Sequence, residues 1–179
     1  MISRIFNPKT DNYRQLKESV ISFNFPWHWM DSSVTNPMVD DTYENFGYYS
    51  HCFLGSPGGH GGKTYYSFPS SSFLTQVQDV FVEILNFNNI SPEVIFRLHA
   101  NCVHPTKTGK PGFPHTDHNF THTNALIYLT DTYSGDTIVE GESYSGKEDE
   151  VIIFEGEHYH LPPTEGRRIV LVATFLTGQ

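Results

Sequence analysis

The segment spanning residues 113–130 holds the residues whose types and spacing most suggest chemistry. It reads FPHTDHNFTHTNALIYLT, and its His115 and Asp117 are two residues apart. In an extended chain, residues i and i+2 project to the same face, roughly 6–7 Å apart along the strand, so an imidazole nitrogen and a carboxylate oxygen can reach one ion. A second histidine from a distant strand would complete a two-histidine, one-carboxylate face with open positions. That ligand set suits non-haem Fe(II) and oxygen chemistry.

A later segment, FEGEHYH, supplies candidates for that second histidine. His158 and His160 both follow a short apolar run, and Arg168 stands at the start of the last predicted strand. A His-x-Asp pair alone is a weak signal, because a chain with ten histidines produces one by chance quite often. The pair gains weight here because histidine, aspartate, histidine and arginine all fall at predicted strand ends or turns.

Composition limits the classes of function. The 179 residues carry a formal net charge of −9, and the longest basic cluster is the pair Arg167-Arg168, so no nucleic-acid footprint is visible. The length predicts one domain over residues 1–179. Within it, the sequence pattern indicates residues 1–92 as helical and loop support and residues 93–176 as a β core.

The chain also carries indications of its compartment. Only two cysteines occur, Cys52 and Cys102, and we interpret them as reduced thiols. No basic-then-apolar leader opens the sequence, and no apolar run approaches the roughly 18 residues of a membrane span. We therefore expect a cytoplasmic protein without a membrane segment.

The first half of the chain predicts a short strand and two helices. Residues 2–6 read as the strand, and residues 13–23 and 73–85 show apolar side chains at intervals of three and four that are typical of amphipathic helices. The glycine-rich segment 55–62 lacks the Lys-Ser/Thr ending of a phosphate-binding loop. A mobile lid and a disordered loop tip are equally good interpretations of it.

After residue 92 the pattern changes to closely spaced strands. They are predicted at residues 94–102, 126–130, 137–139, 151–154 and 168–175. Short strands separated by Gly, Pro and Asp turns favour an antiparallel sandwich or barrel, and a jelly roll fits best. We thus predict a mainly β protein with a few N-terminal helices.

Five pieces of the sequence, in order and at matching distances, resemble the Fe(II)/2-oxoglutarate-dependent oxygenases, particularly the prolyl-4-hydroxylase-like branch. They are FPHTD at 113–117, LIYLTD at 126–131, SGDT at 134–137, VIIFEGEHYH at 151–160 and RIVLVATF at 168–175. The resemblance covers about residues 94–176. It implies a double-stranded β-helix that binds Fe(II), 2-oxoglutarate and O2, with ascorbate as a further reductant of the family.

The resemblance also implies roles for individual residues. Fe(II) would be held by His115, Asp117 and His160, where His160 is preferred to His158 because the family has its histidine in an aromatic-His pair at this point. The far carboxylate of 2-oxoglutarate would pair with Arg168, which is preferred to Arg167. Tyr128 matches a second hydroxyl donor to that carboxylate, and Asn101 matches a position near the cosubstrate. Val170 departs from the family pattern, which has Ser or Thr there.

The activity that follows from the resemblance is hydroxylation of a C–H bond with release of succinate and CO2. The branch suggests a peptidyl proline as substrate, while another protein side chain or a small molecule fits the residues equally well. Two other classes stay open. One is a cupin-like metalloprotein that uses no 2-oxoglutarate, suggested by the pair His158 and His160. The other is a non-catalytic jelly-roll binding module in which the histidines are merely packed.

Overall fold

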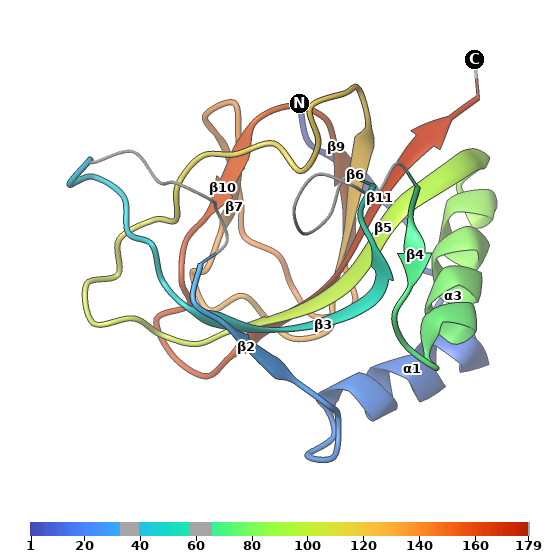
Figure 1. Cartoon of the computed structure of the whole chain (residues 1–179), viewed down its shortest axis with the longest axis horizontal. Coiled ribbons are helices and arrows are strands. Elements are labelled where there is room, and N and C mark those ends of the chain that lie inside the picture. The colour runs from blue at the N-terminus through green and yellow to red at the C-terminus, as the bar shows by residue number, and fades with distance from the viewer. Residues whose placement is uncertain (33–39, 58–65, 179) are drawn as a thin grey trace.

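A computed structural model describes residues 1–32, 40–57 and 66–178 (Figure 1). Most of the glycine-rich segment, residues 58–62, lies outside this part of the chain, so its interpretation as a lid stays a prediction. Within the described residues, no helix has both the length and the apolar character needed to span a membrane. Both cysteines are free thiols, as expected.

A large antiparallel sheet forms the main wall of the molecule. Its strands, in spatial order, are β1 (Ser3–Ile5), β9 (Val151–Phe154), β6 (Thr123–Tyr128), β11 (Arg168–Thr177), β5 (Pro92–Val103), β3 (Tyr48–Gly55) and β2 (His28–Met30), with β4 (Phe68–Pro69) paired to β3. The long strands β5 and β11 lie at its centre and pair from Arg168 opposite Val103 to Thr177 opposite Pro92.

A small antiparallel sheet faces the large one. It consists of β10 (His158–His160), β7 (Thr137–Val139) and β8 (Glu142–Tyr144), in that order. Figure 1 shows β7 and β10 on one side of the large sheet and the two helices on the other. The two facing sheets form the predicted double-stranded β-helix, which confirms the mainly β jelly-roll fold.

The helices α1 (Asp11–Ile21) and α3 (Leu74–Phe87) cover the outer face of the large sheet. In α1 the buried residues are Tyr13, Leu16 and Val20, at the three-to-four spacing that places side chains on one helix face. They join a core with alternate residues of the strands, among them Leu98, Ala100, Ile127, Leu171 and Phe175. This helix-covered core holds the sheet in place.

The intervening residues of the same strands face the space between the two sheets. Leu126 and Tyr128 of β6 and Val170 and Val172 of β11 belong to this second buried cluster, together with Ile152 of β9. Successive side chains of a strand point to opposite faces, so each strand contributes to both cores. The interior cluster is the smaller one, and the candidate site lies beside it.

Most predicted elements are present with shifted ends. Strands 137–139 and 151–154 agree with β7 and β9, and the predicted helix 73–85 corresponds to α3. The sequence did not predict β2, β4, β8 or β10, and of β3 it indicated only an extended piece near residues 46–49. These strands are short or lack an apolar alternation, so pairing with a neighbouring strand, which is a tertiary effect, determines them.

Candidate active site

A cavity opens between the two sheets, and its walls come from strands far apart in the sequence. Its polar lining comprises Tyr48, Arg97, Asn101, His115, Asp117, His158, His160 and Arg168. Its apolar lining comprises Phe46, Val103, Phe113, Leu126, Val170 and Val172. Six of the eight polar residues are histidine, aspartate or arginine, which is the composition of a site for an ion and an anionic ligand.

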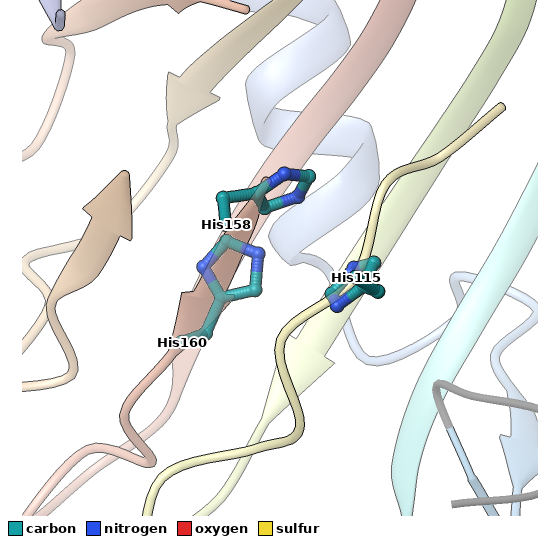
Figure 2. Close-up of side chains that lie close together, drawn as sticks. All are labelled: His115, His158 and His160. Atoms are coloured by element: carbon teal, nitrogen blue, oxygen red, sulfur yellow. The ribbon is translucent and has the colours of Figure 1, made fainter. Parts of the chain in front are cut away.

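Three of the histidines that line this cavity lie close together (Figure 2). His158 and His160 come from β10, and His115 comes from the facing segment, which is joined to β10 by two backbone hydrogen bonds between His115 and His158 of 2.9 and 3.0 Å. One ring nitrogen of each histidine lies within 4.8 Å of the others. The three imidazoles can therefore hold a metal ion.

Asp117 lies beside these histidines, in contact with His158 and Arg97. Its Oδ2 is 3.7 Å from Nε2 of His158, and its Oδ1 accepts a hydrogen bond from Arg97 of β5. Burial alone would raise the pKa of Asp117, but the charge of Arg97 and the neighbouring imidazoles hold it at about 2. The carboxylate is thus ionised near neutral pH and has one oxygen directed toward the histidines.

The hydrogen bonds of His115 and His158 determine which nitrogen each can offer. Nδ1 of His115 lies 3.0 Å from the carbonyl oxygen of Phe113, and Nδ1 of His158 lies 3.4 Å from that of Gly156. A carbonyl oxygen can only accept, so both Nδ1 atoms carry the hydrogen and both Nε2 atoms keep a lone pair. Burial also lowers the pKa of His158 to about 4, which keeps its imidazole neutral. Both residues can therefore bind a metal through Nε2.

His160 differs from these two because its Nδ1 faces a hydroxyl group. That nitrogen lies 3.1 Å from Oγ1 of Thr137, which lies 2.9 Å from the hydroxyl of Tyr128. Burial raises the pKa of Tyr128 to about 12, so the phenol keeps its proton. Thr137 is the one hydrogen-bond partner of this hydroxyl within the described part of the chain.

Tyr128, Thr137 and His160 form a chain of hydrogen bonds, and only one order of donors and acceptors gives every buried O–H group an acceptor. Tyr128 donates to Thr137, and Thr137 donates to Nδ1 of His160, which must then accept. The reverse direction leaves the buried O–H of Tyr128 without an acceptor, at a cost of about 1–3 kcal/mol. We therefore assign the hydrogen of the His160 ring to Nε2. Burial, and after it the charge of Arg168, lower the pKa of His160 well below its usual range, so the ring is neutral.

Arg168 stands on the cavity wall at the start of β11. Its side chain is buried, 3% exposed, and its Nη1 donates to the carbonyl oxygen of Gly135 at 2.9 Å. Its Nε has no hydrogen-bond partner, and no carboxylate of the described residues lies within 4.0 Å of the guanidinium. Burial lowers its pKa, and the neighbouring Tyr128 and Asp136 offset part of that shift. A buried guanidinium with a free edge is suited to an anionic ligand.

The remaining residues proposed from the sequence take different positions. Asn101 lines the cavity, and its Oδ1 accepts a hydrogen bond from Ser50 at 2.9 Å. Tyr128 is fully buried and is not among the residues that line the cavity, and its hydroxyl is hydrogen-bonded to Thr137. Arg167 points away from the cavity and donates to the carbonyl oxygen of Ile21.

Two residues of the site received no role from the sequence. Arg97 shares the inner face of β5 with Asn101 and contacts Asp117. In residues 94–102 the sequence alternates between an apolar face and a face that carries Arg97, His99 and Asn101, so the polar position of Arg97 was predictable, but its contact with Asp117 was not. Thr137 ends the SGDT piece of the family resemblance, but nothing in the sequence indicated that its hydroxyl would lie between Tyr128 and His160.

Comparisons with known proteins agree on the fold. No protein-family profile matches the sequence, and no curated protein matches it either. Similar solved structures include a 2OG-Fe(II) oxygenase family oxidoreductase from Burkholderia pseudomallei, with 12% identity, a TM-score of 0.55 and coverage of 84% of this chain and 72% of that one. A Trichoplax adhaerens prolyl hydroxylase, solved with a hypoxia-inducible factor peptide, has 10% identity, a TM-score of 0.60 and coverage of 98% and 83%.

A third similar structure is a Pseudomonas putida prolyl-4-hydroxylase, with 15% identity, a TM-score of 0.51 and coverage of 98% of this chain and 91% of that one. At such identities the likeness concerns the fold. The family resemblance predicted from the sequence is thus confirmed as a shared architecture.

Proposed function

We propose that the protein is an Fe(II)- and 2-oxoglutarate-dependent oxygenase that hydroxylates a C–H bond and releases succinate and CO2. The observation that carries the proposal is one cavity lined both by histidine and carboxylate ligands and by a buried guanidinium with a free edge, Arg168. The fold shared with oxygenases of this class supports it.

The clustered histidines and Asp117 fit an iron ion. We favour His115, Asp117 and His158 as the ligands, because both imidazoles present a free Nε2 and the carboxylate has one oxygen facing them. Two ligand atoms that each bond one ion at about 2.0–2.2 Å lie about 3–4 Å apart. The 3.7 Å between Asp117 Oδ2 and His158 Nε2 falls in that interval. His160, the ligand preferred from the sequence, belongs to the same cluster, but we assign its ring hydrogen to Nε2.

The rest of the cavity fits a dicarboxylic cosubstrate. The free edge of Arg168 can meet a carboxylate with parallel hydrogen bonds, which a guanidinium forms better than an ammonium group. Leu126, Val170 and Val172 line the same cavity and offer apolar contacts to methylene groups. Val170, which replaces the hydroxyl residue of the family pattern, thus leaves Arg168 as the main anchor of the carboxylate.

The mechanism assigns the protein residues to binding, orientation and exclusion of water. Iron with 2-oxoglutarate and O2 would supply the oxidising chemistry. Arg97 takes one oxygen of Asp117 and thereby fixes which oxygen faces the ion. The backbone carbonyls of Phe113 and Gly156 fix the tautomers of the two histidines. The apolar walls keep water from the reacting centre.

The direct test is turnover of 2-oxoglutarate. The protein, purified under argon and given Fe(II), is expected to convert 2-oxoglutarate to succinate on admission of O2, even without substrate at a low uncoupled rate. Metal content is measured in parallel. Iron binding at stoichiometry without any succinate, coupled or uncoupled, would exclude the proposed activity, and failure to bind metal would exclude the whole site.

A second candidate function has an observation of its own. Three histidines within 4.8 Å could bind a metal without Asp117, as in a dioxygenase or isomerase of the cupin type that needs no 2-oxoglutarate. That reading leaves the buried Arg168 without a ligand, so we place it second. If the metal raises the melting temperature and 2-oxoglutarate adds nothing, this second function is the better one.

The substrate is proposed more broadly. Phe46, Tyr48 and Phe113 line the cavity and give it an aromatic surface. Aromatic faces suit a prolyl ring or another apolar group. One similar structure is a prolyl hydroxylase with a bound peptide, so a peptidyl proline is the first substrate to assay. A cytoplasmic location and ascorbate as reductant stay predictions.

A further inference from the structure

We propose that His160 is a cosubstrate-binding residue whose Nε2–H group donates a hydrogen bond to the carboxylate adjoining the oxo group of the bound 2-oxo acid. The inference rests on the proposed function, since it concerns the same cavity. It assigns to the second histidine of the His-Tyr-His segment a role other than metal ligation.

The position of His160 places it beside the atoms of such a ligand. It lines the cavity together with His158 and Arg168, and one of its ring nitrogens lies within 4.8 Å of one ring nitrogen of each of the other two histidines. An ion held by two of those nitrogens would lie about 2 Å from each of them, and an oxygen bound to the ion would lie about 2 Å from the ion. The ring of His160 lines the same cavity and is therefore close to the place that such an oxygen would take.

The three histidines are distinguished by what their Nδ1 atoms face. His115 and His158 face backbone carbonyls and must donate, whereas His160 faces Thr137 and accepts from it. A nitrogen that carries hydrogen has no lone pair for a metal. The cluster thus contains two ligand nitrogens and one N–H donor, and a carboxylate bound at this site needs a donor.

Tyr128 acts through this chain as a positioning residue. It is fully buried, and its hydroxyl is bonded to Thr137, which is bonded to His160. The phenol therefore contributes to cosubstrate binding by holding the tautomer of His160, not by contacting the ligand. Replacing Thr137 with valine keeps the side-chain shape and removes the connection.

The first experiment reads the tautomers directly. The metal-free protein is labelled with 15N in its histidine rings, and long-range 1H–15N spectra are recorded for wild type and for Thr137→Val. We expect His160 to carry its hydrogen on Nε2, with His115 and His158 carrying theirs on Nδ1. In Thr137→Val the His160 signals should shift toward a mixture of tautomers. An Nδ1–H tautomer of His160 in the wild type overturns the inference.

The second experiment measures binding of the cosubstrate without turnover. Mn2+ replaces iron, and calorimetry gives the affinities for Mn2+ and for 2-oxoglutarate in wild type, His160→Leu, His160→Gln and Thr137→Val. One lost hydrogen bond to a charged group corresponds to roughly a 10-fold to 100-fold weaker 2-oxoglutarate affinity in His160→Leu. Glutamine can donate from a similar position and should recover part of it. The 2-oxoglutarate affinity of Thr137→Val should lie between those of His160→Leu and His160→Gln. The Mn2+ affinity of every variant should stay within about 3-fold of the wild-type value.

The outcomes separate this inference from the proposed function. Wild-type protein that binds Mn2+ but not 2-oxoglutarate refutes the proposed function itself. Wild-type binding of both, with His160→Leu equal to wild type, refutes only the role of His160. Loss of Mn2+ binding in folded His160→Leu, or its loss in the milder His160→Gln variant, makes His160 a metal ligand and also refutes the inference. Circular dichroism checks the fold of each variant.

Discussion

The outer and inner faces of the large sheet are made by the same strands, yet they are built under different constraints. On the outer face, Leu98 and Leu171 pack with the helices in a continuous apolar core. On the inner face, Val170 and Val172 pack in a smaller cluster, and the cavity beside them contains Arg97 and Arg168. The outer face is filled by the protein, whereas the inner face leaves room for a ligand.

The charges on the two sides show the same contrast. On the outer side, Asp149 precedes β9 and is contacted by Tyr13, Lys9 and Lys17 at 2.5–2.9 Å. Its hydrogen-bonding capacity is therefore used within the protein. Arg168 on the inner side is more deeply buried but has an unpaired Nε. A protein tolerates an unpaired buried charge where a ligand completes it. Substitutions on the outer side should therefore cost stability, and substitutions on the inner side should cost binding.

The largest effect is expected from a core residue of the outer side. Phe81 of α3 is 1% exposed, and Phe81→Ala should lower the free energy of unfolding by about 3–5 kcal/mol through lost contacts and a cavity. Urea denaturation measures it. Phe87 on the same helix is 59% exposed, so Phe87→Ala, as the control, should cost about 1 kcal/mol or less. Equal costs for the two variants would contradict the assignment of the outer core.

The next effect concerns the inner side. Arg168→Leu should weaken 2-oxoglutarate binding by about 100-fold or more, because a buried carboxylate would lose its charged partner. The free energy of unfolding should change by only about 1 kcal/mol, since the arginine has no carboxylate partner within the described protein.

Arg167 provides the matched control for this experiment. It adjoins Arg168 but points outward to Ile21, so Arg167→Leu should leave 2-oxoglutarate affinity unchanged in calorimetry with the Mn2+-loaded protein. A similar loss in both variants would mean that net charge, not the position of one guanidinium, governs the binding.

Asp149, the paired carboxylate on the outer side, tests how the free energy of unfolding depends on pH. Burial alone would raise the pKa of Asp149, but its hydrogen bonds to Lys17, Tyr13 and Lys9 hold it at about 2, against about 3.9 in an unfolded chain. A depressed folded pKa means that this stabilisation is fully present above about pH 4 and is lost as the pH falls toward about 2.

The variant Asp149→Asn should accordingly cost about 2 kcal/mol in urea denaturation near pH 7, and much less near pH 2. Asparagine also tolerates the left-handed backbone at this position, where φ is 69°. Asp11→Asn removes the exposed ion pair with Arg14 and should cost about 0.5 kcal/mol or less. A cost for Asp149→Asn that does not diminish in acid would show that the charge is not its cause.

The smallest expected effect concerns Arg97 on the inner side and its influence on metal binding. Arg97→Lys keeps the positive charge beside Asp117 but loses the planar fork, and it should weaken metal binding by about 10-fold. Competition with a chelating dye measures the metal affinity. Arg14→Lys, at an exposed ion pair, is the control and should have no effect. Unchanged metal affinity in Arg97→Lys would show that Arg97 does not orient the carboxylate.

Much of the architecture was predictable because periodicity reports which face is buried. An alternation of apolar and polar residues predicted most of β5, short apolar runs bounded by turn residues predicted most of β9 and β11, and the three-to-four spacing predicted both helices. The strand β10 was not predictable, because His-Tyr-His has no apolar alternation and becomes a strand by pairing with β7 and bridging to His115. Its register is what brings His158 and His160 into the cavity together.

Residue types and spacing were enough to identify the candidates: a His-x-Asp pair, two later histidines and an arginine at the start of the last strand. These follow from residue types and from periods of two and about four, which local geometry imposes on any chain. The tertiary structure alone decided how the candidates differ, because the differences lie in partners that are distant along the chain. The carbonyl oxygen of Gly156 lies beside Nδ1 of His158, and the hydroxyl of Thr137 lies beside Nδ1 of His160; our proposal of a metal role for the first and a cosubstrate role for the second rests on this difference.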